Sequence, residues 1–184
     1  MSNKTLLDIL ESRADLSDYV FHFTKGENAI ETLQKILEQK EIVDLNSNGF
    51  ICFTEAPLYS LVDMFELFKK YPDPMFAPYG IGILKEDFYG NYGGRPVIYG
   101  PIREKKYIPS QLQWRYVLYE PPYDFTWLRE WRTNLSTIEI DPSKHIVITN
   151  TIGEEIGYSN SFGEVSVDIE YEDGDYSGYA SVHA

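Results

Sequence analysis

The stretch Asp124–Arg132, with the sequence DFTWLREWR, is the segment from which the rest of the chain is best interpreted. It places one carboxylate, Glu130, among two arginines and two tryptophans. A neighbouring cation keeps a carboxylate ionised and aromatic walls exclude water, so Glu130 is a candidate catalytic group. The structural alternative is a sheet strand whose arginines form ion pairs and whose tryptophans fill the core. This stretch alone leaves both interpretations open.

Composition bounds the class of protein. The chain has 184 residues, 43% of them hydrophobic and 15% aromatic, which predicts one folded domain with a real core. The formal charge is −13 and the pI is near 4.6. Such a field repels nucleic acid at long range, so nucleic acid is disfavoured as a partner except as a modified acceptor or at a local patch.

The single cysteine, Cys52, excludes an intramolecular disulfide and a thiolate metal cluster. It lies in the apolar run Phe50–Phe53, where we expect a buried thiol. Three scattered histidines do not indicate a zinc site, so no metal is expected. The first residues lack an apolar signal core and no run reaches the length of a membrane span, which predicts a cytoplasmic protein with no membrane partner.

Hydrophobic periodicity predicts the elements of the first half. Apolar residues recur at helical spacing in 27–39, with charges on the other face. The strand at 19–24 alternates, which puts His22 and Thr24 on one face and Phe21 on the other. The predicted elements of this half are a helix at 4–12, a strand at 19–24, a helix at 27–39, a short strand or loop anchor at 42–43, a strand at 50–54 and a helix at 58–70.

Strands dominate the second half. The predicted strands are 79–85, 96–99, 127–133, 138–140, 145–149 and 165–169. Residues 109–120 fit a helix or a strand, with the helix favoured because Leu112, Tyr116 and Tyr119 share a face. The acidic, glycine-rich chain beyond Tyr171 is expected to fray.

This order predicts an α+β fold with a mixed or mostly antiparallel sheet, and with helices mainly from the N-terminal half. Residues 1–155 form the expected single domain. Residues 156–184 are expected to be an acidic extension with one possible strand.

Three polar residues outside the opening stretch need interpretation. His22 and Thr24 could hold one ligand together, or His22 could be a core histidine bonded to a backbone carbonyl. Glu55, at a strand-to-helix turn, is best explained as a favourable charge at a helix N-terminus. The chain has no Gly-x-Ser-x-Gly elbow, no phosphate-binding loop and no Rossmann glycine pattern.

Once these motifs are excluded, the candidate polar residues are His22 and Thr24 near the start of the chain, Tyr79 or Tyr99 in its middle, and Glu130 in its second half. This set suits chemistry at a ribosyl centre. Departure of nicotinamide from NAD leaves an oxocarbenium-like cation, which a nearby carboxylate stabilises. A histidine can fix ribose hydroxyls, and a tyrosine ring can stack on nicotinamide.

The motifs also resemble known families. His22-Phe23-Thr24, followed by the helix at Leu33–Leu37, resembles the opening of ADP-ribosyltransferase-like proteins, including DarT-type toxins. The series Phe50–Leu58, Tyr79-Gly80-Ile81, Pro96–Tyr99 and Arg129–Arg132 is similar to the AbiGi-type abortive-infection family of phage-resistance proteins. The likeness covers residues 18–150.

The resemblance implies a split ADP-ribosyltransferase-like sheet with NAD bound as substrate. His22 would hold the ribose with Thr24, and Glu130 would be the catalytic glutamate of this transferase. Tyr79, or Tyr99 in its place, would stack on nicotinamide. Arg132 would orient Glu130 or meet a phosphate.

Two functions of different class follow. The first is an NAD-dependent ADP-ribosyltransferase-like effector in phage defence or a toxin–antitoxin system. The second is a non-catalytic antitoxin or regulatory protein that keeps the fold and binds a cognate protein partner, with its acidic charge masking a basic surface. Geometry separates them. The enzyme needs His22 and Glu130 to face one cleft with a tyrosine between them, whereas a Glu130 enclosed and paired to Arg132 favours the binding protein.

Overall fold

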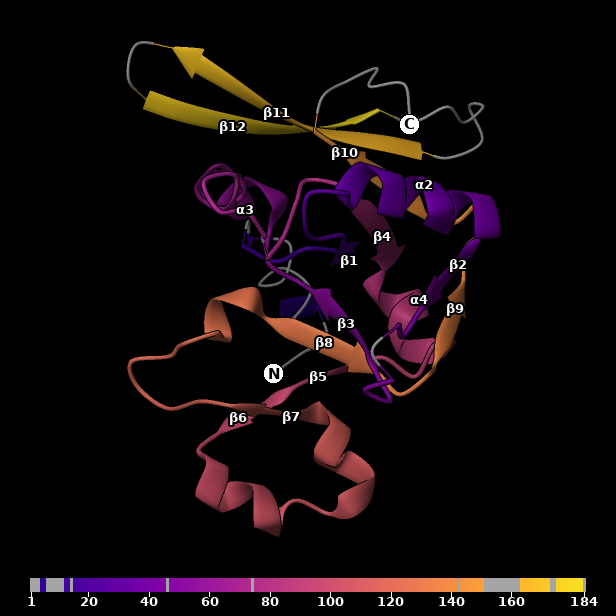
Figure 1. Ribbon diagram of the computed structural model, residues 1–184, viewed down its shortest axis with the longest axis vertical. Helices are drawn as coiled ribbons and strands as arrows, with labels where there is room; N and C mark the ends of the chain where they lie inside the picture. Colours follow the sequence, from indigo (N-terminus) through magenta and orange to yellow (C-terminus); the bar gives the residue numbers. More distant parts are fainter. Residues whose placement is uncertain are drawn as a thin grey trace.

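An eight-stranded sheet lies at the centre of the computed structural model (Figure 1). The structure describes residues 4–5, 12–13, 15–45, 47–73, 75–141, 143–150, 163–172 and 175–183. In chain order the elements, with 3₁₀ helices written η, are β1 (Tyr19–Phe23), α2 (Ala29–Gln39), β2 (Glu41–Val43), β3 (Ile51–Thr54), α3 (Leu58–Phe68), β4 (Gly80–Leu84), α4 (Lys85–Gly90), β5 (Arg95–Pro96), β6 (Ile98–Gly100), η1 (Ile102–Tyr107), η2 (Ser110–Arg115), β7 (Tyr116–Leu118), η3 (Thr126–Leu128), β8 (Glu130–Thr133), β9 (Thr137–Glu139), β10 (Ile146–Thr149), β11 (Gly163–Glu172) and β12 (Asp175–His183).

The strand order in the main sheet is β12-β11-β10-β4-β1-β3-β8-β5. Neighbouring strands run antiparallel except β10 and β11, which are parallel. Two small sheets accompany it, β2 with β9 and β6 with β7. The α+β class with a mostly antiparallel sheet is therefore confirmed.

The main sheet is weakly joined between β1 and β3. β1 pairs with β4 along its whole length, and β3 pairs with β8 along its whole length. Between these fully described strands the register is one pair, Phe21 with Thr54. The sheet thus consists of two halves that meet at this pair.

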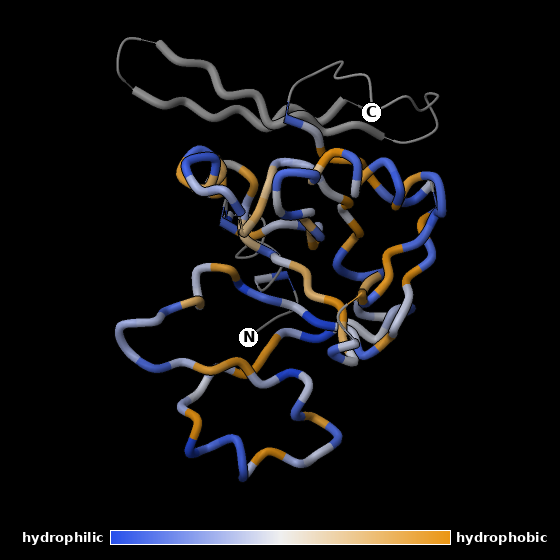
Figure 2. Tube along the Cα trace, viewed as in Figure 1, coloured by the Kyte–Doolittle hydropathy of each residue, from blue (hydrophilic) through white to orange (hydrophobic). Residues whose placement is uncertain are grey.

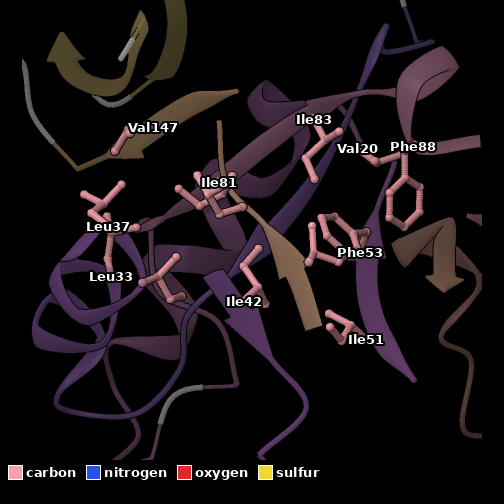
Figure 3. Packing of buried hydrophobic residues seen from close by; sticks show 13 residues of the cluster. Val20, Leu33, Leu37, Ile42, Ile51, Phe53, Ile81, Ile83, Phe88 and Val147 are labelled. Carbon is pink, nitrogen blue, oxygen red and sulfur yellow. The ribbon is translucent and has the colours of Figure 1, made fainter. Parts of the chain in front are cut away.

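Each face of the sheet carries its own core, because side chains alternate along a strand. Val20 packs with Phe53, Ile83 and Phe88 in a cluster that α2 and the β2–β9 pair cover (Figure 3). On the opposite face Phe21 and the other members of the second cluster pack against α3; the further members are Phe23, Ala56, Leu58, Leu61, Val62, Phe65 and Ile148.

Residues 98–118, here called the lobe, project from the sheet at the bottom of Figure 1. The lobe comprises β6, η1, η2 and β7, and its two strands pair in parallel. It lies next to the end of the sheet where β8 and β5 run.

Several expectations need correction. The helix favoured over 109–120 is wrong in part: residues 110–115 form a 3₁₀ helix, and Tyr116–Leu118 is a strand because it pairs with Ile98–Gly100. The frayed tail beyond Tyr171 is also wrong, since Asp175–His183 is a strand paired to β11. The short strand at 42–43 is confirmed as β2. Most of the helix predicted at 4–12 lies outside the described residues.

Candidate functional site

Glu130 begins β8 and forms an ion pair along its own strand. Its Oε1 lies 2.7 Å from Nε of Arg132, and both side chains are only 12% exposed. Residues two apart on a strand share a face, so the pair follows from the local fold. The other flanking cation turns away: Arg129 adopts φ 44° and its guanidinium pairs with Asp15 at 2.8 Å.

Arg132 also fastens the lobe to the sheet. Its Nη1 donates hydrogen bonds to the carbonyl oxygens of Trp114, at 2.8 Å, and Tyr116, at 3.4 Å. Its guanidinium carbon lies 4.0 Å from the centre of the Phe50 ring, a stacking distance. The lobe backbone therefore lies close to the Glu130–Arg132 pair, which is enclosed.

Tyr99 reaches the backbone of the same strand rather than an open cleft. Its hydroxyl accepts the Glu130 N–H at 3.1 Å and donates to the Phe125 carbonyl at 3.3 Å. Burial raises the pKa of Tyr99, and the negative charge of Glu130 adds to the effect. Tyr99 thus holds the start of β8 in place.

His22 lies on the other face of the sheet. Its ring packs at 5.4 Å from the Phe53 ring, and its Nδ1 is 2.9 Å from the Cys52 carbonyl oxygen. A carbonyl oxygen only accepts hydrogen bonds, so Nδ1 carries the proton and Nε2 is the unprotonated nitrogen of the neutral ring. Burial lowers the pKa of His22 below its ordinary value, against the opposing effect of the Cys52 carbonyl. The imidazole thereby bridges β1 and β3 beside their single register pair.

Thr24 and Tyr79 lie side by side at the end of β1. The Thr24 hydroxyl donates to the Tyr79 carbonyl at 2.9 Å, and the Thr24 N–H donates to the same oxygen at 2.8 Å. The Tyr79 ring packs against the first core cluster and lines a cavity of about 680 Å³. The other lining residues include Gly26, Ile30, Lys70, Tyr71 and Asn150.

The predicted residues thus form two groups. Tyr99 of the lobe meets Glu130 of β8, which pairs with Arg132, whereas Thr24 and Tyr79 meet at the far end of β1. The register makes the faces explicit: Thr54 lies opposite both Phe21 and Glu130, which places Glu130 on the Phe21 face. His22 follows Phe21 and therefore points from the opposite face.

Cys52 is exposed, so the expectation of a buried thiol is wrong. On β3 it lies opposite Arg132, and its side chain shares the face of Glu130. Partial removal of water from around the sulfur and the negative charge of Glu130 together raise the pKa of the Cys52 thiol to about 12. This microenvironment opposes a thiolate nucleophile.

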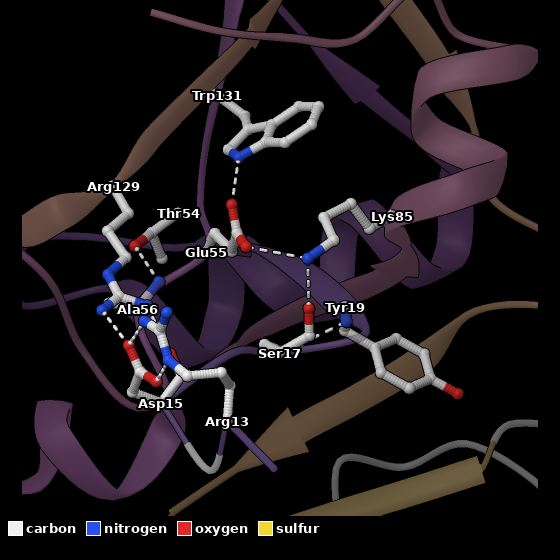
Figure 4. A network of polar contacts seen from close by, with 10 residues as sticks. All are labelled: Arg13, Asp15, Ser17, Tyr19, Thr54, Glu55, Ala56, Lys85, Arg129 and Trp131. Carbon is white, nitrogen blue, oxygen red and sulfur yellow. Dashed lines mark hydrogen bonds and ion pairs between the residues drawn. The ribbon is translucent and has the colours of Figure 1, made fainter. Parts of the chain in front are cut away.

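Sequence reasoning missed a polar network around Glu55. Its carboxylate accepts from Lys85 Nζ at 2.8 Å and from Trp131 Nε1 at 2.7 Å (Figure 4). Lys85 also donates to the Ser17 carbonyl at 2.7 Å. The network joins the ends of β3, β4 and β8. The only sequence signal was a carboxylate immediately after a strand.

The described residues include no group of three or more His, Cys, Asp or Glu side chains placed to hold a metal ion. Among the helices of the same residues, none has the length and apolar character needed to cross a bilayer. Comparisons of the chain with protein-family models, with curated protein sequences and with solved structures find no match.

Proposed function

We propose that this chain is a non-catalytic binding protein that keeps an ADP-ribosyltransferase-like fold. It would serve as a regulatory or antitoxin-like partner in a bacterial abortive-infection system. The observation that carries the proposal is the state of Glu130: its carboxylate is paired to Arg132 at 2.7 Å, and both side chains are largely enclosed. A carboxylate that stabilises a ribosyl cation needs room for the substrate beside it.

A second observation supports the same function. His22 and Glu130 lie on opposite faces of the strands that carry them, as the register of β1, β3 and β8 requires. Tyr99 is bonded to backbone groups of Glu130 and Phe125. The Thr24 hydroxyl is likewise bonded to backbone. The hydroxyl groups of Tyr99 and Thr24, which were candidates for ligand binding, therefore make hydrogen bonds within the fold.

Charge favours a protein partner over a free nucleic acid. The chain carries a formal charge of −13, so its field attracts a basic surface and speeds encounter with it. Recognition of this kind weakens at high ionic strength, because salt screens exposed charges.

The competing proposal is an NAD-dependent ADP-ribosyltransferase-like enzyme. One specific observation favours it: the sheet is joined by a single pair between β1 and β3, as a split sheet requires, and the His22 imidazole lies at that junction. The cavity beside Tyr79 lies at the end of the same strand. In this reaction nicotinamide would leave the ribose of NAD, and an acceptor nucleophile would take its place.

NAD consumption tests the two proposals against each other. Purified full-length protein is incubated with NAD and host-cell extract, alongside Glu130→Gln and His22→Asn. Glu139→Gln, which changes an exposed carboxylate, is the matched control. The binding protein should leave NAD intact in every case, and NAD should not raise its melting temperature. Turnover that disappears in Glu130→Gln and His22→Asn, but persists in Glu139→Gln, would overturn the proposal in favour of the enzyme.

A capture experiment tests directly whether the protein binds a partner. The protein is immobilised in host extract at low salt, and bound proteins are eluted with increasing salt. The proposal expects a stoichiometric partner that elutes as the salt rises. A salt-independent complex, or no complex at all, would count against it.

A further inference from the structure

The lobe exposes apolar side chains that do not contribute to the protein core. Neither η1 nor η2 has any buried residue. Ile102 is 59% exposed, Tyr107 is 73% exposed, and Leu112 is also exposed. Figure 2 shows hydrophobic and hydrophilic residues alternating around this loop, away from the main body. All three residues belong to this one small lobe, and exposed apolar surface that is bordered by polar residues is typical of an interaction site.

The lobe backbone is held in place although the apolar side chains of η1 are exposed. Arg132 bonds the carbonyls of Trp114 and Tyr116 from the sheet side. Arg115 donates to the Pro96 carbonyl from Nε at 3.0 Å and from Nη2 at 2.8 Å. The Tyr116 hydroxyl donates to the Pro101 carbonyl at 2.7 Å. A surface fixed in this way loses little conformational entropy when a partner binds.

Its charge is opposite to that of the chain as a whole. Residues 102–107, IREKKY, carry Arg103, Lys105 and Lys106 against one acid, Glu104, and all four are exposed. Lys106 Nζ lies 5.0 Å from the centre of the Tyr107 ring, so cation and aromatic face are presented together. A local basic and apolar surface thus exists on a chain whose net charge is −13.

We propose that the lobe is a docking surface for an acidic, partly apolar polypeptide segment of a protein partner. Carboxylates would meet Arg103, Lys105 and Lys106, and apolar side chains would cover Ile102 and Tyr107. The field of the whole chain repels the continuous phosphate charge of nucleic acid and also a second copy of itself, whereas a short acidic segment presents only a few charges.

This inference rests on the proposed function and deepens it, because it names a contact surface and the chemistry of its partner. A partner that is basic elsewhere would meet the acidic body of the chain. An acidic segment at the lobe then fixes orientation, since alternating charge patterns across an interface specify register.

The test uses fluorescence anisotropy with three short labelled probes: a random copolymer of glutamate and tyrosine, polyglutamate of the same length, and a single-stranded oligodeoxynucleotide with the same number of charges. The full-length protein is compared with Lys105→Glu/Lys106→Glu and with Ile102→Ser/Tyr107→Ser. Lys25→Glu/Lys35→Glu is the matched control, because it makes the same change in net charge at exposed lysines elsewhere.

We expect the glutamate–tyrosine copolymer to bind more tightly than polyglutamate, and the oligonucleotide to bind least. Reversal of the lobe lysines should weaken copolymer binding about tenfold, since each exposed ion pair contributes modestly and the new glutamates repel the carboxylates of the probe. The Ile102→Ser/Tyr107→Ser variant should bind the copolymer no better than polyglutamate. An equal loss in the control variant, tighter binding of the oligonucleotide, or no copolymer binding would overturn the inference.

Failure of the inference and failure of the proposed function give different results. NAD turnover that depends on Glu130, together with copolymer binding at the lobe, would remove only the proposed function. Intact NAD with copolymer binding insensitive to the lobe variants would remove only the docking surface.

Discussion

Arg132 Nε lies 2.7 Å from Glu130 Oε1, and the same guanidinium donates to two carbonyl oxygens of the lobe. The pair therefore connects β8 to residues 98–118. Its geometry explains why arginine stands here, because the planar guanidinium presents donors in several directions at once. The stretch from which the chain was first interpreted thus anchors the surface that we propose for binding.

Replacing Arg132 with Ala should destabilise the protein by about 3 kcal/mol, since it leaves an enclosed carboxylate without its partner. The lobe carbonyls lose their donor as well, so trypsin should cut at Lys105 and Lys106 sooner. Urea unfolding and timed proteolysis measure the two effects. Arg103→Ala, at an exposed position, is the control and should unfold like the parent protein. Equal stability and equal cleavage rates of the two variants would show that Arg132 does not hold the lobe.

Replacing Gly80 with Ala should cost about 2 kcal/mol or more, as overpacking in a core does. An added Cβ would overlap the His22 carbonyl oxygen and come within 3.0 Å of the Phe23 ring. Gly90→Ala is a fair control, because nothing lies within 4 Å of the Cβ there. The melting temperatures of both variants test this prediction. A Gly80→Ala protein as stable as Gly90→Ala would contradict the close approach of β1 and β4.

The elements that sequence alone predicts well are those set by local periodicity. Helix α2 has its apolar residues at helical spacing, and β1 alternates, so both were predicted near their observed bounds. Over 109–120 the local pattern fits a helix or a strand and favours the helix, whereas residues 116–118 are a strand because they pair with Ile98–Gly100, which no local pattern reports. Helix α4 follows β4 without a break and was not predicted.

The candidate site could be predicted only in part, for a related reason. Arg129 and Arg132 both lie within two residues of Glu130 in the sequence, so either could pair with it. In the structure Arg132 pairs with Glu130, whereas Arg129 pairs with Asp15. Whether His22 and Glu130 share a face depends on the register of β3, the strand that lies between theirs. Register is a property of long-range pairing, and a shift of one residue would move Glu130 to the opposite face.

Removing the Glu55 carboxylate should destabilise the fold by about 2 kcal/mol, because Lys85 and the Trp131 N–H would lose their acceptor in a partly buried site. Glu55→Ala should also change the tryptophan emission, since the Trp131 indole is bonded to this group. Glu55→Gln retains an acceptor and should cost less. Glu86→Ala changes an exposed carboxylate nearby and serves as control. If Glu55→Ala and Glu86→Ala unfold at the same urea concentration, the network does not stabilise the fold.

Stability should fall as the pH drops below the ordinary histidine pKa of about 6.5. Burial lowers the pKa of both His22 and His145 in the folded chain. Above pH 6.5 both rings are neutral in either state and contribute no pH dependence. Below it the unfolded chain binds protons that the folded chain does not, which favours unfolding. Urea titrations at pH 7.5 and 5.0 should show a smaller loss for His22→Gln than for the parent, and an unchanged loss would contradict a depressed pKa.

The Cys52 thiol should react slowly although it is exposed. With a pKa of about 12, only about one thiol in ten thousand is ionised at pH 8, and the thiolate is the reacting form. Iodoacetamide should therefore alkylate the folded protein far more slowly than it alkylates free cysteine. Glu130→Gln removes the negative charge that helps to raise this pKa, so the rate should increase, whereas Glu139→Gln should leave it unchanged. Rapid alkylation of the parent protein, or equal rates in the two variants, would show that the thiol does not lie beside the Glu130 carboxylate.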